Sequence, residues 1–329
     1  MSASRLNFEH HRQLTRGLLY CLFALAGWLG HCGLGLAGTT ILAVLSDGAE
    51  TYEEAVRGLR EGLGDRARVK VGTVDGLADA DLGLHPGDNL LLVPIGMRAV
   101  RFVARNLPAG ASVLALLVPK QSFSAIVWPA GTGRHQISAV YLDQPLQRTL
   151  QLIQFMDPRL KRVGIVVSEP APDADDAGLG ELPRDAQAMA RASGLSLATQ
   201  TVDNGKGVAE ALRHLLPQVD VLLLLPDRLV VNSANVQHVL LTSYRYRVPV
   251  VGFSPGLVKA GAVAAVYSTP GHIGREGGRM AAIWYGGGDL PAPRHAGGFD
   301  LDINERVARS LGLVPPDERL LRRRLGGER

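Results

Sequence analysis

Apolar runs without polar alternation recur along this chain. One of the clearest is residues 221–225, Val-Leu-Leu-Leu-Leu, which is closed by Pro226 and Asp227. A strand that is covered on both faces has such a sequence, because neither of its sides meets water. The same arrangement recurs at residues 90–96, 113–120, 163–168 and 248–254. The pattern predicts parallel sheets with helices on both faces.

Amphipathic helical segments separate these apolar runs. Strands that alternate with helices in this way form right-handed βαβ units. Predicted strands are 40–45, 67–73, 89–95, 112–118, 137–141, 162–168, 196–202, the run that begins at Val221, and 248–253; predicted helices are 52–63, 97–106, 146–155, 185–192, 207–215, 232–244 and 272–285. The pattern runs through two rounds, so we expect an α/β protein with two similar Rossmann-like lobes.

Breaks in the pattern predict where the lobes begin and end. Residues 143–145 (Asp-Gln-Pro) separate the two rounds, and residues 286–293 are rich in glycine and proline. The chain would cross between the lobes three times, and residues 1–38 would form a leader. We expect the first lobe to comprise 39–142 and 268–293, the second 143–267 and 294–314, and a basic C-terminal tail 315–329.

The composition is that of an ordinary globular α/β protein. Hydrophobic residues make up 46% and charged residues 20% of the 329 residues, a length that suggests two domains rather than one core. The formal net charge is only +4. Part of the basic excess lies near the end of the chain, at Arg319, Arg322, Arg323, Arg324 and Arg329. Such a run is usually a solvated face or tail, and no aromatic residues interleave with it, so we expect no nucleic-acid partner.

The first 38 residues have the layout of a leader. Arg5, Arg12 and Arg16 precede an apolar block at residues 17–30, and small residues follow at 35–38. This order is typical of a secretory signal peptide that is cleaved near residue 37 or 38. A retained membrane anchor is the alternative, since about 20 apolar residues suffice to span a bilayer. We expect export to the periplasm with cleavage.

Both cysteines, Cys21 and Cys32, lie in this leader. Residues 29–32, Leu-Gly-His-Cys, loosely resemble a lipoprotein processing site, although His31 stands where a small residue is expected. Lipidation at Cys32 is therefore an alternative to cleavage near residue 38. Cleavage there would leave the mature protein without a thiol, which suits an oxidising compartment because no stray disulfide can form.

Polar groups that follow the predicted strands are the candidate ligand contacts, because open α/β sheets bind ligands beyond the carboxyl ends of their strands. The amide groups at the first helix start, with the Ser46 hydroxyl, would suit a carboxylate or another anion. Ser46 or Asp47 could equally cap that helix, and Gly96 could serve a tight turn. The first-lobe candidates are Ser46, Asp47, Tyr52, Gly96, Met97 and Gln121, with Lys120 and Ser122 beside the last of these.

The second lobe offers carboxylates and aromatic side chains. Ser168 and Glu169 follow one strand, and Asp227 follows another. A carboxylate here could pair with a ligand ammonium in a water-poor cleft. We favour Asp227 for this role because it ends the most apolar run, although it could instead cap a turn. Phe253 and Tyr267 could stack on the ligand or serve as packing near a hinge.

Several segments carry a family resemblance. They are residues 138–145 (Ser-Ala-Val-Tyr-Leu-Asp-Gln-Pro), 162–165 (Arg-Val-Gly-Ile), 249–254 (Pro-Val-Val-Gly-Phe-Ser), 259–262 (Lys-Ala-Gly-Ala), 299–304 (Phe-Asp-Leu-Asp-Ile-Asn) and 308–313 (Ala-Arg-Ser-Leu-Gly-Leu). In this order they resemble the ABC transporter substrate-binding protein family that includes tryptophan and tyrosine binders. The resemblance extends from about residue 42 to residue 313. It departs from the family at 96–98 (Gly-Met-Arg), where members commonly have a loop of small residues.

The resemblance implies a type I periplasmic binding fold, with two hinged lobes and a ligand cleft between them. It also implies that lobe closure captures a small polar organic solute, with an amino acid as the first guess. The solute would then pass to an ABC permease in the inner membrane, and we expect the protein to be a monomer. The alternative is a sensory or accessory receptor of the same fold with a different membrane partner.

Motifs for cofactors and metals are absent from the sequence. It has no Gly-x-Gly-x-x-Gly after the first strand, no Gly-x-x-x-x-Gly-Lys-Ser/Thr, no His-Glu-x-x-His and no paired-cysteine motif. The glycines at 274, 277 and 278 lie within a predicted helix rather than after a strand. We therefore expect neither enzyme activity nor a cofactor. A cytosolic α/β enzyme acting on a sugar or nucleotide is the alternative, and it requires an uncleaved leader.

Overall fold

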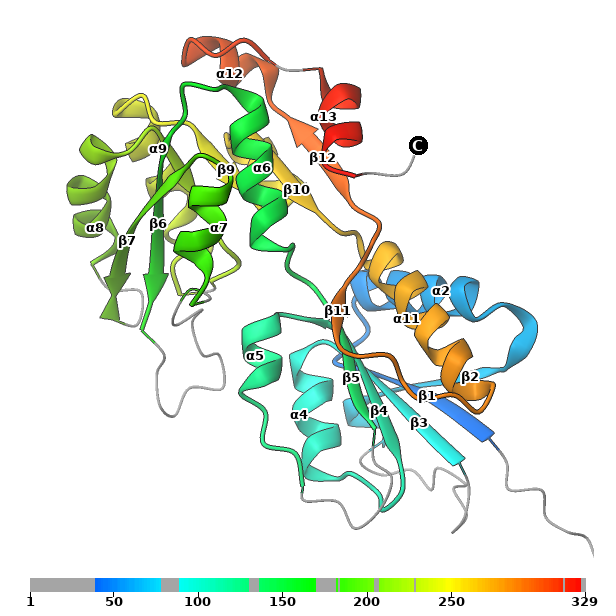
Figure 1. Ribbon diagram of the computed structural model, residues 1–329. Helices are drawn as coiled ribbons and strands as arrows, with labels where there is room; N and C mark the ends of the chain where they lie inside the picture. The colour runs from blue at the N-terminus through cyan, green and yellow to red at the C-terminus, as the bar shows by residue number, and fades with distance from the viewer. Residues whose placement is uncertain are drawn as a thin grey trace, which may run out of the picture. The chain divides into compact units, whose positions relative to one another are not determined.

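The computed structural model describes most of the chain after residue 38. The described residues are 39–77, 89–129, 136–169, 182, 184–203, 207–227, 229–315 and 317–326 (Figure 1). The predicted leader, with Cys21 and Cys32, lies outside them. Across these ranges, helices of the length and apolarity needed to traverse a bilayer are absent.

The first sheet is parallel throughout. Its strands follow the order β11-β5-β4-β3-β1-β2. Helices α2 and α11 cover one face, and α4 covers the other (Figure 1). The strands are β1 (Thr39–Leu45), β2 (Val69–Thr73), β3 (Asn89–Ile95), β4 (Ser112–Val118), β5 (Ile137–Tyr141) and β11 (Arg294–His295); the helices are α2 (Glu50–Leu63), α3 (Val74–Leu77), α4 (Met97–Arg105), α5 (Lys120–Ser124) and α11 (Pro270–Tyr285).

The second sheet repeats this layout with one antiparallel edge. Its strands follow the order β12-β10-β9-β8-β6-β7, and β12 runs antiparallel to β10. The strands are β6 (Arg162–Ser168), β7 (Ser196–Val202), β8 (Val221–Leu223), β9 (Val250–Gly252), β10 (Ala264–Tyr267) and β12 (Asp300–Ile303); the helices are α6 (Leu146–Met156), α7 (Ala186–Ala192), α8 (Val208–Leu215), α9 (Val236–Arg245), α10 (Pro255–Ala260), α12 (Glu305–Ser310) and α13 (Glu318–Arg324). The α/β class and the two similar sheets confirm the predicted fold class.

Several predicted elements are shorter in the structure, and two of them have a clear local cause. Strand β8 ends at Leu223, two residues early, because Pro226 has no N–H to offer a ladder and the Asp227 N–H donates back to the Leu225 carbonyl at 2.7 Å. Helix α9 begins at Val236 rather than at residue 232. The Asn232 Oδ1 accepts hydrogen bonds from two backbone N–H groups that follow it, which holds residues 232–235 in a turn.

Three crossovers join the sheets. They follow β5, β10 and β11, at residues 142–145, 268–269 and 296–299. Strand β11 belongs to the first sheet, where it pairs with β5. The sequence analysis gave residues 294–314 to the second lobe, and β11 forms the first two residues of that range.

The C-terminal segment differs from the solvated tail that its basic sequence suggested. Residues 318–324 form helix α13, which lies beside β12 (Figure 1). Leu321 and Leu325 are buried in the core of the second sheet at 2% and 6% exposure. Asp317 caps the helix by accepting from the Leu320 N–H at 2.8 Å. The expectation is corrected because an apolar pair spaced by four residues gives this helix a buried face.

Glycines let helices α2 and α11 touch through their backbones. A Cβ atom placed on Gly274 of α11 would lie 2.1 Å from the Ala55 carbonyl oxygen of α2, and one on Gly58 of α2 would lie 2.4 Å from the Gly271 carbonyl oxygen. Gly62 and Gly278 are equally tight. These glycines therefore serve close helix packing, which explains their place within a helix.

Substituting Gly274 tests this contact. Gly274→Ala gains about 1 kcal/mol of helix propensity, but its methyl group meets a backbone oxygen that cannot rotate away. Because overpacking of this kind costs about 1–3 kcal/mol or more, we expect a net loss of stability. Urea denaturation followed by circular dichroism measures it. Gly256→Ala is the matched control, because the Cβ position there meets nothing closer than 3.7 Å. Equal stability of the two variants would contradict the account.

Candidate ligand-binding site

The strand ends of the first sheet are tied together by Ser46. Its hydroxyl donates to the Ile95 carbonyl at 3.0 Å and accepts from the Ala99 N–H at 3.1 Å. Ser46 is 2% exposed. Gly96 has a φ of 87°, and a Cβ atom there would lie 2.6 Å from the Ser46 hydroxyl and 2.8 Å from the Tyr52 ring. The three predicted residues thus meet at one point, where they pack against one another and fix the start of α4.

Asp47 and Met97 also have local roles. The Asp47 carboxylate is exposed and accepts from the Ala49 N–H at 2.8 Å, a turn that leads into α2. Met97 begins α4 and packs half-buried against the aromatic cluster around Phe123. Arg98, which the sequence analysis did not weigh alone, donates to the Ser46 carbonyl at 2.9 Å. Its hydrogen bond to Asp75 lowers the pKa of that carboxyl.

Asp227 and Ser168 form a buried pair in the second sheet. The Asp227 carboxylate accepts from the Ser168 N–H at 2.8 Å and from the Ser168 hydroxyl at 2.9 Å. It also accepts from the N–H groups of Leu229 and Val230, at 3.0 and 3.2 Å. Asp227 is 1% exposed and Ser168 is fully buried. The structure therefore gives Asp227 partners within its own lobe, where it joins the end of β6 to the loop after β8.

A cavity of about 510 Å³ lies at the carboxyl ends of strands from both sheets. The first sheet supplies a polar side, from Lys120 and Gln121 of α5 and from Asp143 and His295. The second sheet and its helices supply a side that is largely apolar but includes the charged residues Arg184 and Asp185; its apolar members are Leu146, Leu182, Met189, Leu224, Leu225, Phe253 and Val266. This arrangement can hold a molecule that has charged or hydrogen-bonding groups at one end and an apolar surface at the other.

The polar side of the cavity is organised around Asp143. Its carboxylate accepts from the Lys120 backbone N–H at 2.7 Å and lies 3.2 Å from the His295 Nε2. The His295 ring packs edge-on against Tyr141, with 5.2 Å between the ring centroids. Burial, followed by the nearby Asp143 charge, raises the pKa of Tyr141, so this phenol stays neutral. The Lys120 ammonium group, in contrast, has no ion-pair partner within the described ranges.

The cavity includes two of the ten predicted site residues, Gln121 and Phe253. Lys120, which the sequence analysis weighed beside Gln121, lines it as well. Tyr267 lies on β10 opposite Asp300 of β12, next to the lining residue Val266 but not itself among the lining residues. Burial and the neighbouring Asp302 and Asp300 raise the pKa of Tyr267 to about 12. The remaining seven are Ser46, Asp47, Tyr52, Gly96, Met97, Ser168 and Asp227, which also lie outside the lining.

Sequence reasoning missed several lining residues. Asp143 directly follows the crossover strand β5, so the rule that singled out other strand ends could have found it. The sequence analysis used that segment only as a joint between lobes. His295 lies on a two-residue strand, which is too short to produce a pattern. Met189 and Leu225 carry no signal of their own, because apolar residues at such positions are usually core.

Groups of three or more potential metal ligands are absent from the part of the chain that the structure describes.

Comparison with known families identifies one match. A family model described as ABC transporter substrate binding protein matches residues 133–324, which is more than half of the chain. The sequence matches no curated protein. The family resemblance predicted from the sequence is confirmed.

Solved structures show the same fold. A protein from Streptococcus pneumoniae in complex with L-Trp has 17% identity, with 86% of this chain and 97% of that chain covered and a TM-score of 0.55. A conserved domain protein from Vibrio cholerae has 19% identity, covering 86% and 98%, with a TM-score of 0.56. A ligand-free, open substrate-binding protein with adhesive properties from Clostridium difficile has 16% identity, covering 85% and 96%, with a TM-score of 0.61. Identities this low show the fold alone, which is the predicted type I periplasmic binding fold.

The internal role of Asp227 predicts a loss of stability rather than of affinity alone. Asp227→Ala would leave the Ser168 N–H and the two loop N–H groups without their acceptor, at a cost of about 2–4 kcal/mol. Thermal and urea unfolding measure it. Asp47→Ala is the control, because that exposed carboxylate accepts a backbone hydrogen bond from Ala49 and its loss should cost at most about 1 kcal/mol. An Asp227→Ala variant that kept its stability and lost only solute binding would restore the ligand role.

Proposed function

Because this chain belongs to the ABC transporter substrate-binding protein family, we propose that it captures a small polar organic solute and delivers it to an ABC permease. An amino acid is the first ligand class to test. Members of this family bind solutes rather than convert them, so the protein is a binding protein and not an enzyme.

The cavity at the strand ends of both sheets is the observation that carries the proposal. Its two sides come from different sheets, which are joined by crossovers rather than by a shared core. A solute that touches both sides gains contacts that exist only when the sheets approach each other. Such a solute shifts the population toward a closed form, because a ligand moves an equilibrium by its difference in affinity for the two states.

The chemistry of the lining supports an amino acid as the first ligand to test. The Lys120 ammonium group is suited to a carboxylate, and the Asp143 carboxylate and the amide of Gln121 are suited to an ammonium group. Phe253 and Leu225 can pack against an apolar side chain. The L-Trp in the Streptococcus pneumoniae structure is a reason to include aromatic amino acids in the panel.

Export to the periplasm is part of the proposal, because an importer's binding protein meets its solute outside the cytosol. The basic, apolar and small-residue order of residues 1–38 supports it. We expect N-terminal sequencing of protein from a periplasmic extract to begin near residue 38. Full-length protein found only in the cytosol would contradict the proposal. Mass spectrometry of the same sample would detect a lipid on Cys32 if processing occurs there instead.

A solute screen with a charge variant tests the proposed binding mode. Isothermal titration against the 20 common L-amino acids, sugars and polyols should identify at least one solute that binds. A thermal-shift measurement should show that the same solute raises the melting temperature of the protein. For a carboxylate-bearing solute, Lys120→Met should weaken binding about tenfold, or about 1.4 kcal/mol, because it removes the charge and keeps the stem.

Lys259→Met is the matched control for that variant. Lys259 is an exposed residue of α10 that does not line the cavity, so its loss should leave affinity unchanged. Equal affinities of the Lys120 and Lys259 variants would rule out the charge role of Lys120. A purified protein that no solute in the panel stabilises would overturn the proposed function.

A further inference from the structure

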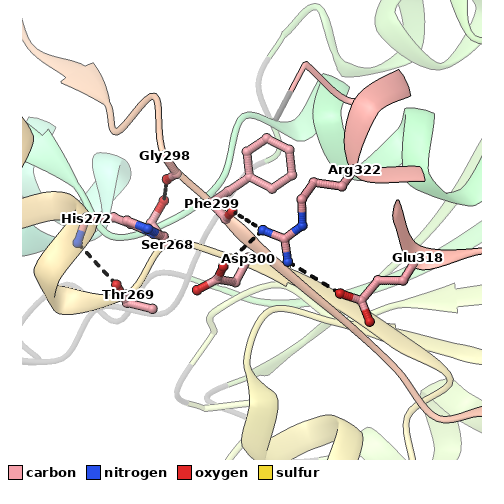
Figure 2. A network of polar contacts seen from close by, with 8 residues as sticks. All are labelled: Ser268, Thr269, His272, Gly298, Phe299, Asp300, Glu318 and Arg322. Carbon is pink, nitrogen blue, oxygen red and sulfur yellow. Dashed lines mark hydrogen bonds and ion pairs between the residues drawn. The ribbon is translucent and has the colours of Figure 1, made fainter. Parts of the chain in front are cut away.

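The three crossovers between the sheets are hydrogen-bonded to one another. Gln144 Nε2 in the first crossover donates to Ser268 Oγ in the second, at 2.8 Å. Ser268 Oγ donates in turn to the Gly298 carbonyl in the third, at 2.7 Å (Figure 2). Ser268 is 6% exposed, and shielding from water strengthens such bonds. The three passages of the chain therefore form a single crossover bundle.

Two arginines fasten the crossover bundle to elements of the second sheet. Arg148 of α6 donates to the Gln144 Oε1 at 2.5 Å, and its guanidinium lies 4.3 Å from the centroid of the Phe299 ring. Arg322 of α13 donates to the Phe299 carbonyl at 3.1 Å and pairs with the Asp300 carboxylate at 3.0 Å (Figure 2). The third crossover is thus held by residues of two helices, α6 and α13, at the point where it enters β12.

An unhindered glycine lies between the bundle and the first sheet. On one side of it, His295 is held by the Asp143 carboxylate and by the pairing of β11 with β5. On the other side, Gly298 is held by Ser268. Between them, a Cβ atom on Gly297 would meet nothing within 4 Å. Gly297 therefore has room for backbone rotation, and rotation there leaves the arginine contacts on the other side of Gly298 intact.

A surface ion pair is the simpler explanation for Arg322. Its guanidinium also lies 3.4 Å from Glu318, one turn earlier on α13, and such pairs contribute little. That explanation leaves out the bond to the Phe299 carbonyl, which is an uncharged group on another element. It also leaves out the half-buried state of the arginine, whose side chain is 29% exposed. Arg323, the next residue on the helix, is exposed and has no side-chain partner within the described ranges.

We infer that Arg322, together with Arg148, is a positioning residue for lobe closure. By holding the third crossover on the second sheet, it confines bending to the Gly297 side of the bundle and narrows the ensemble of open forms. A narrower open ensemble lowers the entropy that closure must remove, which favours solute binding at a cavity that Arg322 does not touch. The role of Arg322 in lobe closure rests on the proposed function. The attachment of the third crossover to the second sheet, in contrast, can be tested without any solute.

Pulsed electron paramagnetic resonance on the solute-free full chain tests the fastening. The two native cysteines are removed by Cys21→Ser and Cys32→Ser, and spin labels are attached through Arg57→Cys on α2 and Arg213→Cys on α8, both at exposed positions. In this background, Arg322→Ala should broaden the distance distribution between the labels. Hydrogen exchange in residues 296–303 should accelerate by about tenfold, because the local opening of the crossover becomes easier.

Arg323→Ala is the matched control, and it should leave both measurements as in the parent protein. Arg322→Lys should give an intermediate broadening, because an ammonium group keeps the charge but lacks the planar fork that serves two acceptors. This variant decides the question alone if Arg322→Ala does not fold. Distance distributions and exchange rates that stay the same in the Arg322 variants and in Arg323→Ala would overturn the inference. That result would leave the proposed function standing, since no solute enters the experiment.

Discussion

Helices α2 and α11 touch backbone to backbone, and this contact brings a segment that follows β10 of the second sheet onto the first sheet. Any side chain larger than hydrogen at Gly58, Gly62, Gly274 or Gly278 would overlap a backbone atom of the facing helix or approach it too closely. Because α11 and β11 belong to the first sheet while β10 before them and β12 after them belong to the second, the chain must leave the second sheet and return to it. The second and third crossovers are the direct consequence of that exchange.

The crossovers also determine where a ligand can bind. They leave the carboxyl ends of parallel strands from both sheets at the same cavity, where one side is polar and the other largely apolar. Two polar groups at other strand ends take no part in this lining. Ser46 and Asp227 turn inward instead, where they tie a strand to the loop or helix that follows a neighbouring strand. The lining is therefore built on fixed strand ends, and preorganised polar groups of this kind favour specific binding.

Much of the fold could be predicted because strands that are buried on both faces have continuous apolar sequences. Strand β4 is buried at every position, and its bounds were predicted to the residue. The antiparallel edge strand β12 and helix α13 were harder, since tertiary packing rather than periodicity defines them. The site was only partly predictable. A carboxylate after a strand can face a ligand or its own loop, and Asp227 shows that the sequence does not distinguish these. Phe253 and Gln121 were found because they lie within three residues of a strand end, whereas His295 depends on a strand of two residues that only pairing with β5 creates.

The account as a whole depends on one claim, that a solute occupies the cavity between the two sheets and touches both. A crystal structure of the protein with the most stabilising solute from a broad panel tests it most directly. The account predicts electron density for the solute between Lys120 or Gln121 on one side and Phe253 on the other, with both sheets in contact with it. Density for the solute on the surface of one sheet alone would contradict it.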